Sequence, residues 1–555
     1  MHRFLLLAAL AFTAVAGLQP SVTIKNGTVQ GVDLPQFNQS LFLGIPYAQP
    51  PVGDLRLRPP RSIHSNASFG TLDATAYGPH CWSRFTTGFD DNTGFNNSED
   101  CLTLNVIRPT GASEKFLVPV VVWIHGGGLS TGGSGDFRYN GSWLVEASIS
   151  NGKPIVFVSI NYRLASLGFL AGKALADEGS LNLGVRDQRL ALHWVQENIA
   201  KFGGNPSKVT IQGERSIPID LGVCNHSVIA YAGRDDKLFN QAIAESGTNG
   251  GNFSLPTAAS FQATYNGLLA NTSCSLTVNS SEAAQLSCLR SLPIDEFRQH
   301  SVGSTGIVFD GDIVNVPGTF EAYRTGRWVK AAFLLGSNTD EGVSFGSSSA
   351  NTTADVRASL AGSVPAALID PILELYPDVP SLGCPFNTGD FQLGPGLQRK
   401  RVSAILGDIS MAAGPRWLAQ EVSSQVPFYK FRFNHKPYST SFSVQDFIGH
   451  FLEVSYVFNL QNNDTAFWIT NHFTATYLGP TAPIEDRFLG AYMARSWASF
   501  IATGDPNNAN VPSKIHWPKY SDGQQNMVWQ TQGSVTEKDN FRQAGIQFII
   551  DNIYF

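Results

Sequence analysis

The residues with the clearest chemical potential are a run of glycines, a carboxylate and a histidine, met in that order along the chain. Three glycines end the run His125-Gly126-Gly127-Gly128, directly after an apolar segment. Consecutive glycine N–H groups can approach and bind an oxyanion, because no side chain stands in the way. Glu341 follows a later apolar segment, and a carboxylate there can orient an imidazole. His450 can take and return a proton near neutral pH. Taken singly, these features also fit an ordinary glycine turn, a solvated acid and a structural histidine.

These residues could cleave a bond only together with a nucleophile. The sequence motif that would supply one is present but interrupted. The β-branched run Val209-Thr210-Ile211 leads into Gly213-Glu214, which opens the pattern G-x-S-x-G. In that pattern a sharp turn from strand to helix lifts a serine hydroxyl above a sheet. Here the serine position holds Arg215, followed by Ser216, Ile217 and Pro218. Because the residues after such a turn begin a tightly packed helix, the bulk of Ile217 and the ring of Pro218 conflict with it.

The order of these parts, nucleophile turn, acid and then histidine, is that of the α/β-hydrolases. The chain resembles the type-B carboxylesterase/lipase family, which includes cholinesterases and secreted fungal lipases. The resemblance extends from Val22 nearly to the C-terminus. It rests on these blocks: Gly44–Arg56, Glu99–Val106, Trp123–Gly128, Asn161–Arg163, Asn182–Val209, Arg234–Asp236, Glu245–Gly247, Asp340–Gly342 and His450–Phe458.

The resemblance implies roles for particular residues. Gly127 and Gly128 would donate to the oxyanion, Glu341 would be the acid of the triad and His450 its base. Ser216 is the candidate nucleophile, one residue from the family position. The resemblance also implies disulfides, Cys81–Cys101 and Cys274–Cys288, and leaves Cys224 and Cys384 without assigned partners. In lipases the first disulfide loop bears a lid, and here it carries aromatic residues that are either lid residues or anchors packed on the body: Trp82, Phe85, Phe89 and Phe95.

Three interpretations account for the break between Arg215 and Asn225. Ser216 serves as a displaced nucleophile; or the protein is a non-catalytic, binding or adhesion-like relative; or the stretch comes from a mis-spliced gene model and the natural protein carries the family serine. We favour the third. A relative that had lost catalysis would be free to lose its glycines, Glu341 and His450, and drift would not confine itself to one block with sharp edges.

The pattern of apolar runs predicts an α/β fold. We expect an α/β-hydrolase fold with a mostly parallel, doubly wound sheet and helical insertions. The segment 21–32 is typical of a hairpin, 42–53 is too rich in Pro and Gly for regular structure, and 185–200 has helical spacing. The region 254–315 should be a mostly helical insertion. The expected strands of the sheet are 102–107, 120–124, 155–160, 209–211, 331–335 and 428–433.

Composition and processing signals predict a secreted protein. Residues 1–16 are basic, then apolar, then Ala14-Val15-Ala16, which is typical of a signal peptide, so 17–555 should form a single domain. The formal charge of −6 with no basic block argues against nucleic acid, and no later apolar run is long enough for a transmembrane anchor. We expect a small-molecule or lipid ester as substrate, contact with a lipid interface, and no metal or cofactor. N-glycosylation triplets begin at Asn26, Asn38, Asn66, Asn96, Asn140, Asn252, Asn271, Asn279, Asn351 and Asn463.

Overall fold

The computed structural model describes most of the chain. It covers residues 19–554, with the exception of 65–66, 84–95, 215–222, 247–254, 302–305, 345, 348, 384–388, 391, 439–446, 463–481 and 513, and of the side chains of 223–226.

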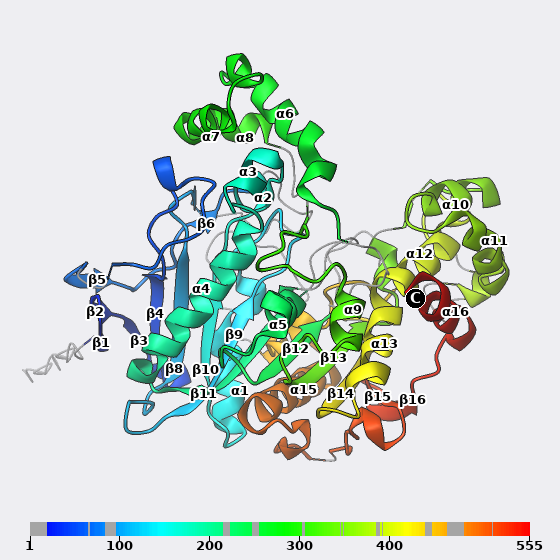
Figure 1. Cartoon of the computed structure of the whole chain (residues 1–555). Helices are drawn as coiled ribbons and strands as arrows, with labels where there is room; N and C mark the ends of the chain where they lie inside the picture. The colour runs from blue at the N-terminus through cyan, green and yellow to red at the C-terminus, as the bar shows by residue number, and fades with distance from the viewer. Residues whose placement is uncertain are drawn as a thin grey trace, which may run out of the picture.

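An eleven-stranded sheet runs through the molecule (Figure 1). Its central strands, from β10 to β15, are parallel, and antiparallel strands extend it at both edges. In spatial order the strands are β16 (Val535–Lys538), β15 (Gln525–Trp529), β14 (Phe428–Phe433), β13 (Ala332–Asn338), β12 (Gln241–Glu245), β11 (Gly204–Glu214), β9 (Val118–Ile124), β10 (Val156–Ile160), β8 (Thr103–Pro109), β4 (Gln39–Pro46) and β3 (Val32–Leu34). The expected mostly parallel sheet is confirmed.

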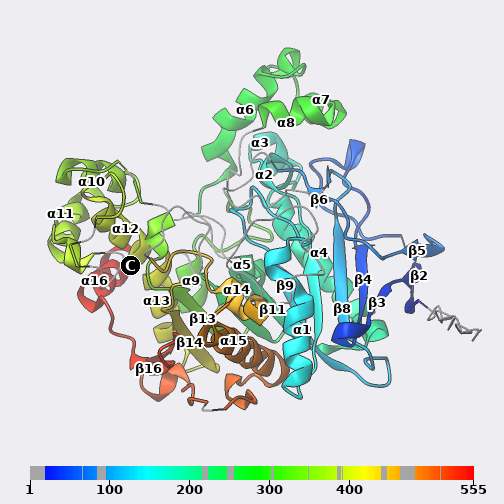
Figure 2. The same ribbon diagram turned by 180° about the vertical axis from the view of Figure 1, so that it is seen from behind.

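Helices cover both faces of the sheet, which explains why its central strands are apolar throughout. Every residue of β10 and β12 is buried, as strands covered on both sides require. One face packs against α1 (Gly141–Ser150), α14 (Val454–Val457) and α15 (Ile484–Thr503) (Figure 2). The other packs against α4 (Leu183–Asn198), α5 (Val223–Gly233), α9 (Thr319–Arg324) and α13 (Ala413–Val422).

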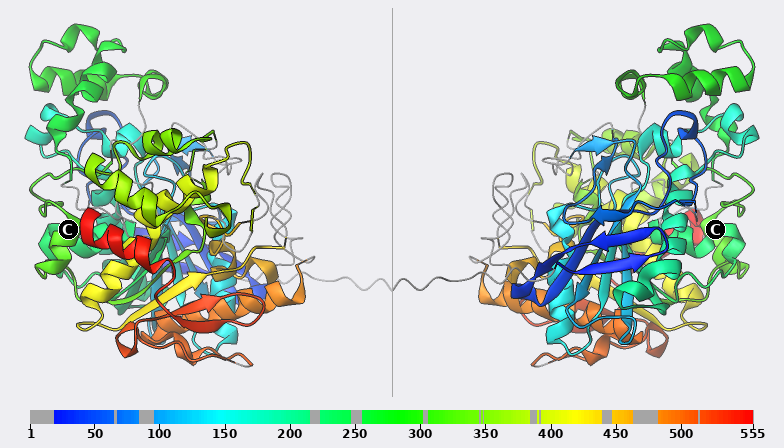
Figure 3. Two further views of the ribbon diagram at one scale, coloured as in Figure 1. Left: turned by 90° about the vertical axis from the view of Figure 1, so that its right-hand side faces the viewer. Right: turned by 90° about the vertical axis from the view of Figure 1, so that its left-hand side faces the viewer.

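Two groups of helices stand at the periphery of this core. The expected helical insertion contains α6 (Gln262–Ala270), α7 (Glu282–Ser291) and α8 (Ile294–His300), which pack near α2 (Ala165–Phe169) and α3 (Lys173–Asp177). In the second group, α16 (Gln543–Ile553) packs against α11 (Ala366–Leu375) and α13, as Figure 3 shows in red, yellow-green and yellow. Helix α10 (Thr353–Leu360) packs against α12 (Arg399–Gly407) in the same group.

The N-terminal region contains one wrong expectation. The predicted hairpin forms from β1 (Ser21–Ile24) and β2 (Gly27–Gln30), which pairs onward with β5 (Thr71–Asp73), and β6 (His80–Cys81) pairs with β7 (Asn97–Ser98). Residues 42–46, however, belong to strand β4 and are not irregular. The glycine is tolerated because the pairing with β8 shifts register between Phe42 and Ile45, where Gly44 has φ +68°. Such a bulge is where a strand accepts glycine.

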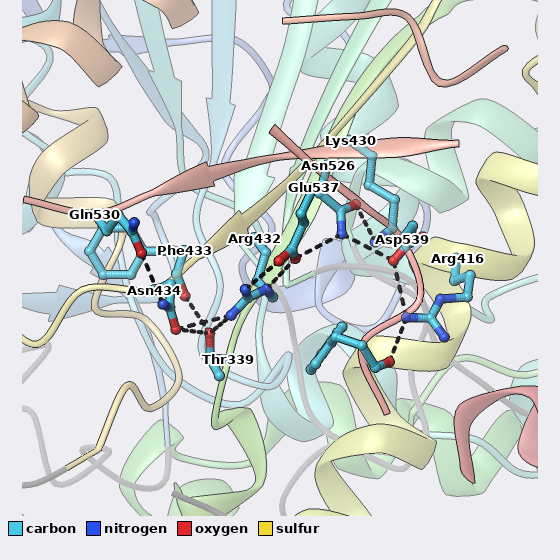
Figure 4. A network of polar contacts seen from close by, with 11 residues as sticks. Thr339, Arg416, Lys430, Arg432, Phe433, Asn434, Asn526, Gln530, Glu537 and Asp539 are labelled. Atoms are coloured by element: carbon cyan, nitrogen blue, oxygen red, sulfur yellow. Dashed lines mark hydrogen bonds and ion pairs between the residues drawn. The ribbon is translucent and has the colours of Figure 1, made fainter. Parts of the chain in front are cut away.

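Buried charges hold the C-terminal edge of the sheet together (Figure 4). Asp539 lies just beyond β16. One of its carboxylate oxygens is 3.1 Å from Nη2 of Arg416 on α13, and the other is 3.0 Å from Nζ of Lys430 on β14. Next to it, Arg432 forms a two-pronged contact with Glu537 of β16. These pairs lock the last two strands onto β14, although nothing in the sequence singles them out.

Candidate active site

Several predicted site residues follow the ends of parallel strands. β9 ends before the glycine run, β11 ends at Glu214, and β13 ends three residues before Glu341. The carboxyl ends of parallel strands lie along one edge of a sheet, which is where open α/β folds build their sites. Loops that are far apart in sequence are thereby brought together.

The glycine run turns sharply as it leaves β9. Gly127 and Gly128 have φ values of +106° and +67°, a region that side chains disfavour. A Cβ atom on Gly127 would lie 2.3 Å from the carbonyl oxygen of Thr131, so no other residue fits there. Among the described residues, neither glycine N–H donates a hydrogen bond. The arrangement therefore presents two consecutive donors, as an oxyanion site requires.

His125, at the start of this run, has a structural place. Its ring stacks on Tyr162 with centroids 4.5 Å apart, and the Tyr162 hydroxyl donates to the His125 carbonyl oxygen at 2.8 Å. With 1% of its surface exposed, His125 fixes the direction in which the chain enters the glycines.

Glu341 and His450 lie in direct contact. Nδ1 of His450 is 2.9 Å from Oε2 of Glu341, and the two side chains are 15% and 2% exposed, in that order. The other oxygen of Glu341 accepts the N–H of Asn338 at 2.7 Å. The Asn338 side chain in turn donates to the carbonyl oxygen of Gly449 at 2.7 Å. Asn338 thus holds the acid and the segment that leads to the histidine in one frame.

Two residues that carried no role in the sequence analysis also surround this pair. Ser246 follows β12, is fully buried, and donates from Oγ to Oε1 of Glu341 at 2.5 Å. Its φ of +53° is unusual for serine and indicates local strain. Oε1 of Glu214 lies 3.5 Å from Nδ1 of His450, so a second carboxylate faces the imidazole.

Two further buried acids lie behind the pair. Glu453 accepts a hydrogen bond from the Asn338 side chain, and burial together with the charge of Glu341 raises the pKa of Glu453 to about 7. Glu245 accepts from Trp497 at 2.8 Å and from Gln212 at 2.9 Å. Burial, and then the charge of Glu453, raises the pKa of Glu245 to about 8. In the sequence, both belong to blocks that carry the family resemblance, Glu245–Gly247 and His450–Phe458, which is the signal that could have drawn attention to them.

The structure describes the predicted nucleophile turn only as far as Glu214. β11 reaches Glu214 as expected, whereas Arg215, Ser216 and the rest of 215–222 lie outside the described residues. The helix that follows, α5, is irregular: Ala230, Tyr231 and Ala232 leave helical backbone angles. The role of Ser216 stays a prediction.

The two disulfides implied by the resemblance, Cys81–Cys101 and Cys274–Cys288, are formed. Trp82, beside the first, packs on the helical insertion, where the guanidinium of Arg298 lies 3.5 Å from its ring centroid. Trp82 is therefore an anchor. Phe85, Phe89 and Phe95 lie outside the described residues, so the lid stays a prediction.

Within the described ranges, no cluster of three or more His, Cys, Asp or Glu side chains could hold a metal ion. In that same part of the chain, no helix is both long and apolar enough to cross a membrane.

Comparison with known proteins gives matches along nearly the whole chain. A model of the carboxylesterase family matches residues 18–549. Lipase 4 of Diutina rugosa is 33% identical, over 96% of both chains. Secreted lipase 1 of Botryotinia fuckeliana is 32% identical, over 96% of this chain and 93% of its own. The crystal structure of Aspergillus niger EstA has a TM-score of 0.77 at 25% identity and covers 97% of this chain and 99% of that one. The resemblance predicted from the motifs is confirmed.

Proposed function

Because the chain belongs to the carboxylesterase family and is an ester hydrolase by its relatives, we propose that its site cleaves carboxylic esters through a serine-bound acyl intermediate. The hydrogen bond between Glu341 and His450 carries the proposal, and the glycine turn after β9 supports it with two backbone donors. The two groups have the geometry of a base with its orienting acid.

In the proposed reaction, the serine hydroxyl attacks the ester carbonyl while Nε2 of His450 takes its proton. The N–H groups of Gly127 and Gly128 stabilise the negative charge that forms on the carbonyl oxygen. The histidine then gives its proton to the leaving alkoxide, which departs as the alcohol. Water next attacks the acyl group with His450 again as base, releasing the carboxylic acid and restoring the serine. Glu341 keeps the Nδ1 proton in place and stabilises the imidazolium.

We assign the nucleophile to the segment that follows Glu214, in the natural gene product, with the family serine at the position now held by Arg215. Glu214 supports this assignment because its carboxylate already lies beside His450. An arginine at that place would fill the space meant for the substrate carbonyl. The loss of a triad serine lowers turnover on the order of a million-fold, so the chain with Arg215 should be nearly inactive.

The finer features follow the lipase relatives. We propose a lipid ester as substrate, in line with names such as Secreted lipase 1, and secretion of 17–555 as a single domain after removal of residues 1–16. We propose N-linked glycans at exposed asparagines: Asn38, Asn96, Asn271, Asn279 and Asn351. Asn26 should carry none in the folded protein, because its buried amide donates to the carbonyl oxygens of His64 and Ala67.

The test restores the nucleophile turn. The substitutions R215S/S216A/I217G/P218A, here named the elbow-restored enzyme, recreate Gly-Glu-Ser-Ala-Gly and remove the proline that follows it. The enzyme should hydrolyse p-nitrophenyl octanoate and bind a fluorophosphonate covalently at position 215. The matched control R215A/S216A/I217G/P218A lacks only the hydroxyl and should do neither. Equal hydrolysis by both variants would contradict the serine mechanism.

The origin of the break is tested on the natural protein. Tryptic peptides across Gln212 to Asp235 should show Gly-Glu-Ser-x-Gly. If they instead contain the stretch 215–225, and the purified protein cleaves no ester, the binding-protein interpretation replaces ours.

A further inference from the structure

A cavity of about 240 Å³ lies in the group of helices that contains α11, α12 and α16, at the right-hand side of Figure 1. It is bounded by the end of α11, the first turns of α12 and the first turn of α16 (Figure 3). None of its lining residues belongs to the candidate active site. Its volume is below the roughly 300–1,000 Å³ of sites for drug-sized ligands, so the cavity fits a short molecule.

One part of the cavity lining is apolar. Leu382 and Leu397 are 63% and 58% exposed, and Val379 and Leu375 are 43% and 36% exposed. Single exposed leucines are common on protein surfaces, but several gathered around one cavity indicate a surface that binds an apolar group.

The other part of the lining is cationic. The cavity lining contains three cations, Lys400, Arg401 and Arg542, and one carboxylate, Asp378. Arg542 is paired with Asp408 at 3.0 Å, so its charge is balanced within the protein. Oδ1 of Asp378 accepts from the Gln398 side chain. Lys400 is 2% exposed and donates from Nζ to the carbonyl oxygen of Gly389 at 3.1 Å, so Arg401 is the more accessible of the two cations on α12.

Arg401 is held by uncharged acceptors. Its Nε donates to the carbonyl oxygen of Tyr376 at 2.6 Å and its Nη2 to that of Leu373 at 2.8 Å. Its Nη1 donates to the side-chain oxygens of Thr353 at 3.3 Å and Gln398 at 3.4 Å. Within the described part of the chain it forms no ion pair, and burial lowers the pKa of its guanidinium despite the charge of Asp378. A partly buried cation that forms no ion pair is costly, and a ligand carboxylate would stabilise it by its charge. These four hydrogen bonds leave one N–H of Nη2 to donate to such a ligand.

We propose that this cavity binds a medium-chain carboxylic acid, with the carboxylate at Arg401 and the alkyl chain against Leu375, Val379, Leu382 and Leu397. The positive charge of Arg401 attracts the carboxylate of such a ligand, and the apolar part of the lining packs against its alkyl chain. The ligand belongs to the chemical class that ester hydrolysis releases. Binding itself needs no hydrolysis, so it stands or falls apart from the proposed function.

Isothermal titration of the full chain, with Arg215 in place, by sodium octanoate tests the proposal. Octanoate should bind, whereas octan-1-ol, which lacks the charge, should bind at least tenfold more weakly. The cation octyltrimethylammonium should show no binding at this cavity. Octan-1-ol binding as tightly as octanoate would overturn the role of the cation.

Two substitutions locate the site. Ala544→Trp places a bulky ring in the cavity from an exposed position of α16 and should remove one octanoate site from the measured stoichiometry. Any octanoate bound in the active site would persist in this variant and be counted separately. Arg401→Gln should weaken binding at least tenfold, while Arg327→Gln, an exposed arginine elsewhere, should leave it unchanged.

Because Arg401 also bonds two carbonyl oxygens, Arg401→Gln can unfold this region, and its melting temperature is measured beside that of the other variants. Ala544→Trp removes none of these bonds and decides the question by itself. Octanoate binding to folded Ala544→Trp with the stoichiometry and affinity of the unsubstituted chain would overturn the proposal.

Discussion

The Ser246 hydroxyl donates to the oxygen of Glu341 that His450 does not contact. Glu341 is therefore held from three sides, by Ser246, by the N–H of Asn338 and by the imidazole. A carboxylate fixed in this way can face the histidine in only one orientation, which is the preorganisation that catalysis needs.

Removal of the Ser246 hydroxyl should lower activity without ending it. In the elbow-restored enzyme, we expect Ser246→Ala to reduce kcat about tenfold, since a hydrogen bond to a charged group contributes roughly 1.5–3 kcal/mol and two others remain. Ser246→Gly should lose the same activity but be more stable than Ser246→Ala by roughly 1 kcal/mol, because glycine adopts the positive φ without strain. Steady-state kinetics and urea unfolding measure the two effects. Unchanged kcat in both variants would contradict the role of the hydroxyl.

A change in the contact between Glu341 and His450 should lower kcat more than removal of the Ser246 hydroxyl does. Glu341→Gln keeps the shape but presents an amide to Nδ1, which favours the wrong tautomer of His450. We expect kcat to fall on the order of 10⁴-fold, as for the equivalent change in serine proteases, with KM little altered. Fluorophosphonate labelling at position 215 of the elbow-restored enzyme should slow in parallel. Glu374→Gln, at an exposed position of α11, is the matched control and should change neither rate.

The sequence predicts the main part of this site because its residues lie at marked places. Gly127, Glu341 and His450 each occupy a family motif after an apolar strand, so chain order is enough to bring them together. Ser246 and Glu453 lie inside family blocks, Glu245–Gly247 and His450–Phe458, but nothing in the sequence assigns them a role. Their contacts depend on burial that arises only when β12, β13 and α14 pack together.

The same reasoning explains the errors in the fold. The strand β4 escapes sequence prediction because Gly44 and Pro46 weaken its local propensity, whereas its pairing with β8 stabilises it from outside the segment. β12 and β15 escape it as well, since their short mixed sequences become strands only between their neighbours in the sheet. The distant contact, and not the local pattern, decides these elements.

The buried acids predict an unusual dependence of stability on pH. The pKa of Glu453 is raised from 4.5 to about 7 and that of Glu245 to about 8, because burial disfavours their charged forms. The folded protein therefore holds these protons more tightly than the unfolded chain. Their contribution to stability is complete below about pH 4.5 and is lost as the pH rises through 7 and 8.

Urea unfolding between pH 5 and pH 8 measures this loss. Each group should contribute a slope of about 1.4 kcal/mol per pH unit within its range. Glu453→Gln removes the titration but keeps the shape and the contact with Asn338, so its stability should fall less steeply with pH than that of the unsubstituted chain. Identical slopes for the two proteins would show that Glu453 does not carry a raised pKa.

Asp539 predicts the opposite behaviour at low pH. Burial alone would raise the pKa of Asp539, but the charges of Lys430 and Arg416 outweigh it and hold the pKa well below its usual range (Figure 4). Its stabilising effect is therefore present above the unfolded pKa of 3.8 and is lost as the pH falls through the folded pKa.

Asp539→Asn removes the one charge that faces both cations. We expect the variant to lose about 3–5 kcal/mol of unfolding free energy at pH 7, because Lys430 and Arg416 stay buried without a counter-ion between them. Between about pH 4 and pH 2 the difference from the unsubstituted chain should shrink, since the Asp539 carboxyl takes up a proton in the unfolded chain there and favours unfolding. Guanidinium unfolding across this range measures both effects, with the exposed substitution Asp551→Asn as control. If the difference in unfolding free energy between Asp539→Asn and the unsubstituted chain stays constant down to about pH 2, the cations do not lower the pKa of Asp539.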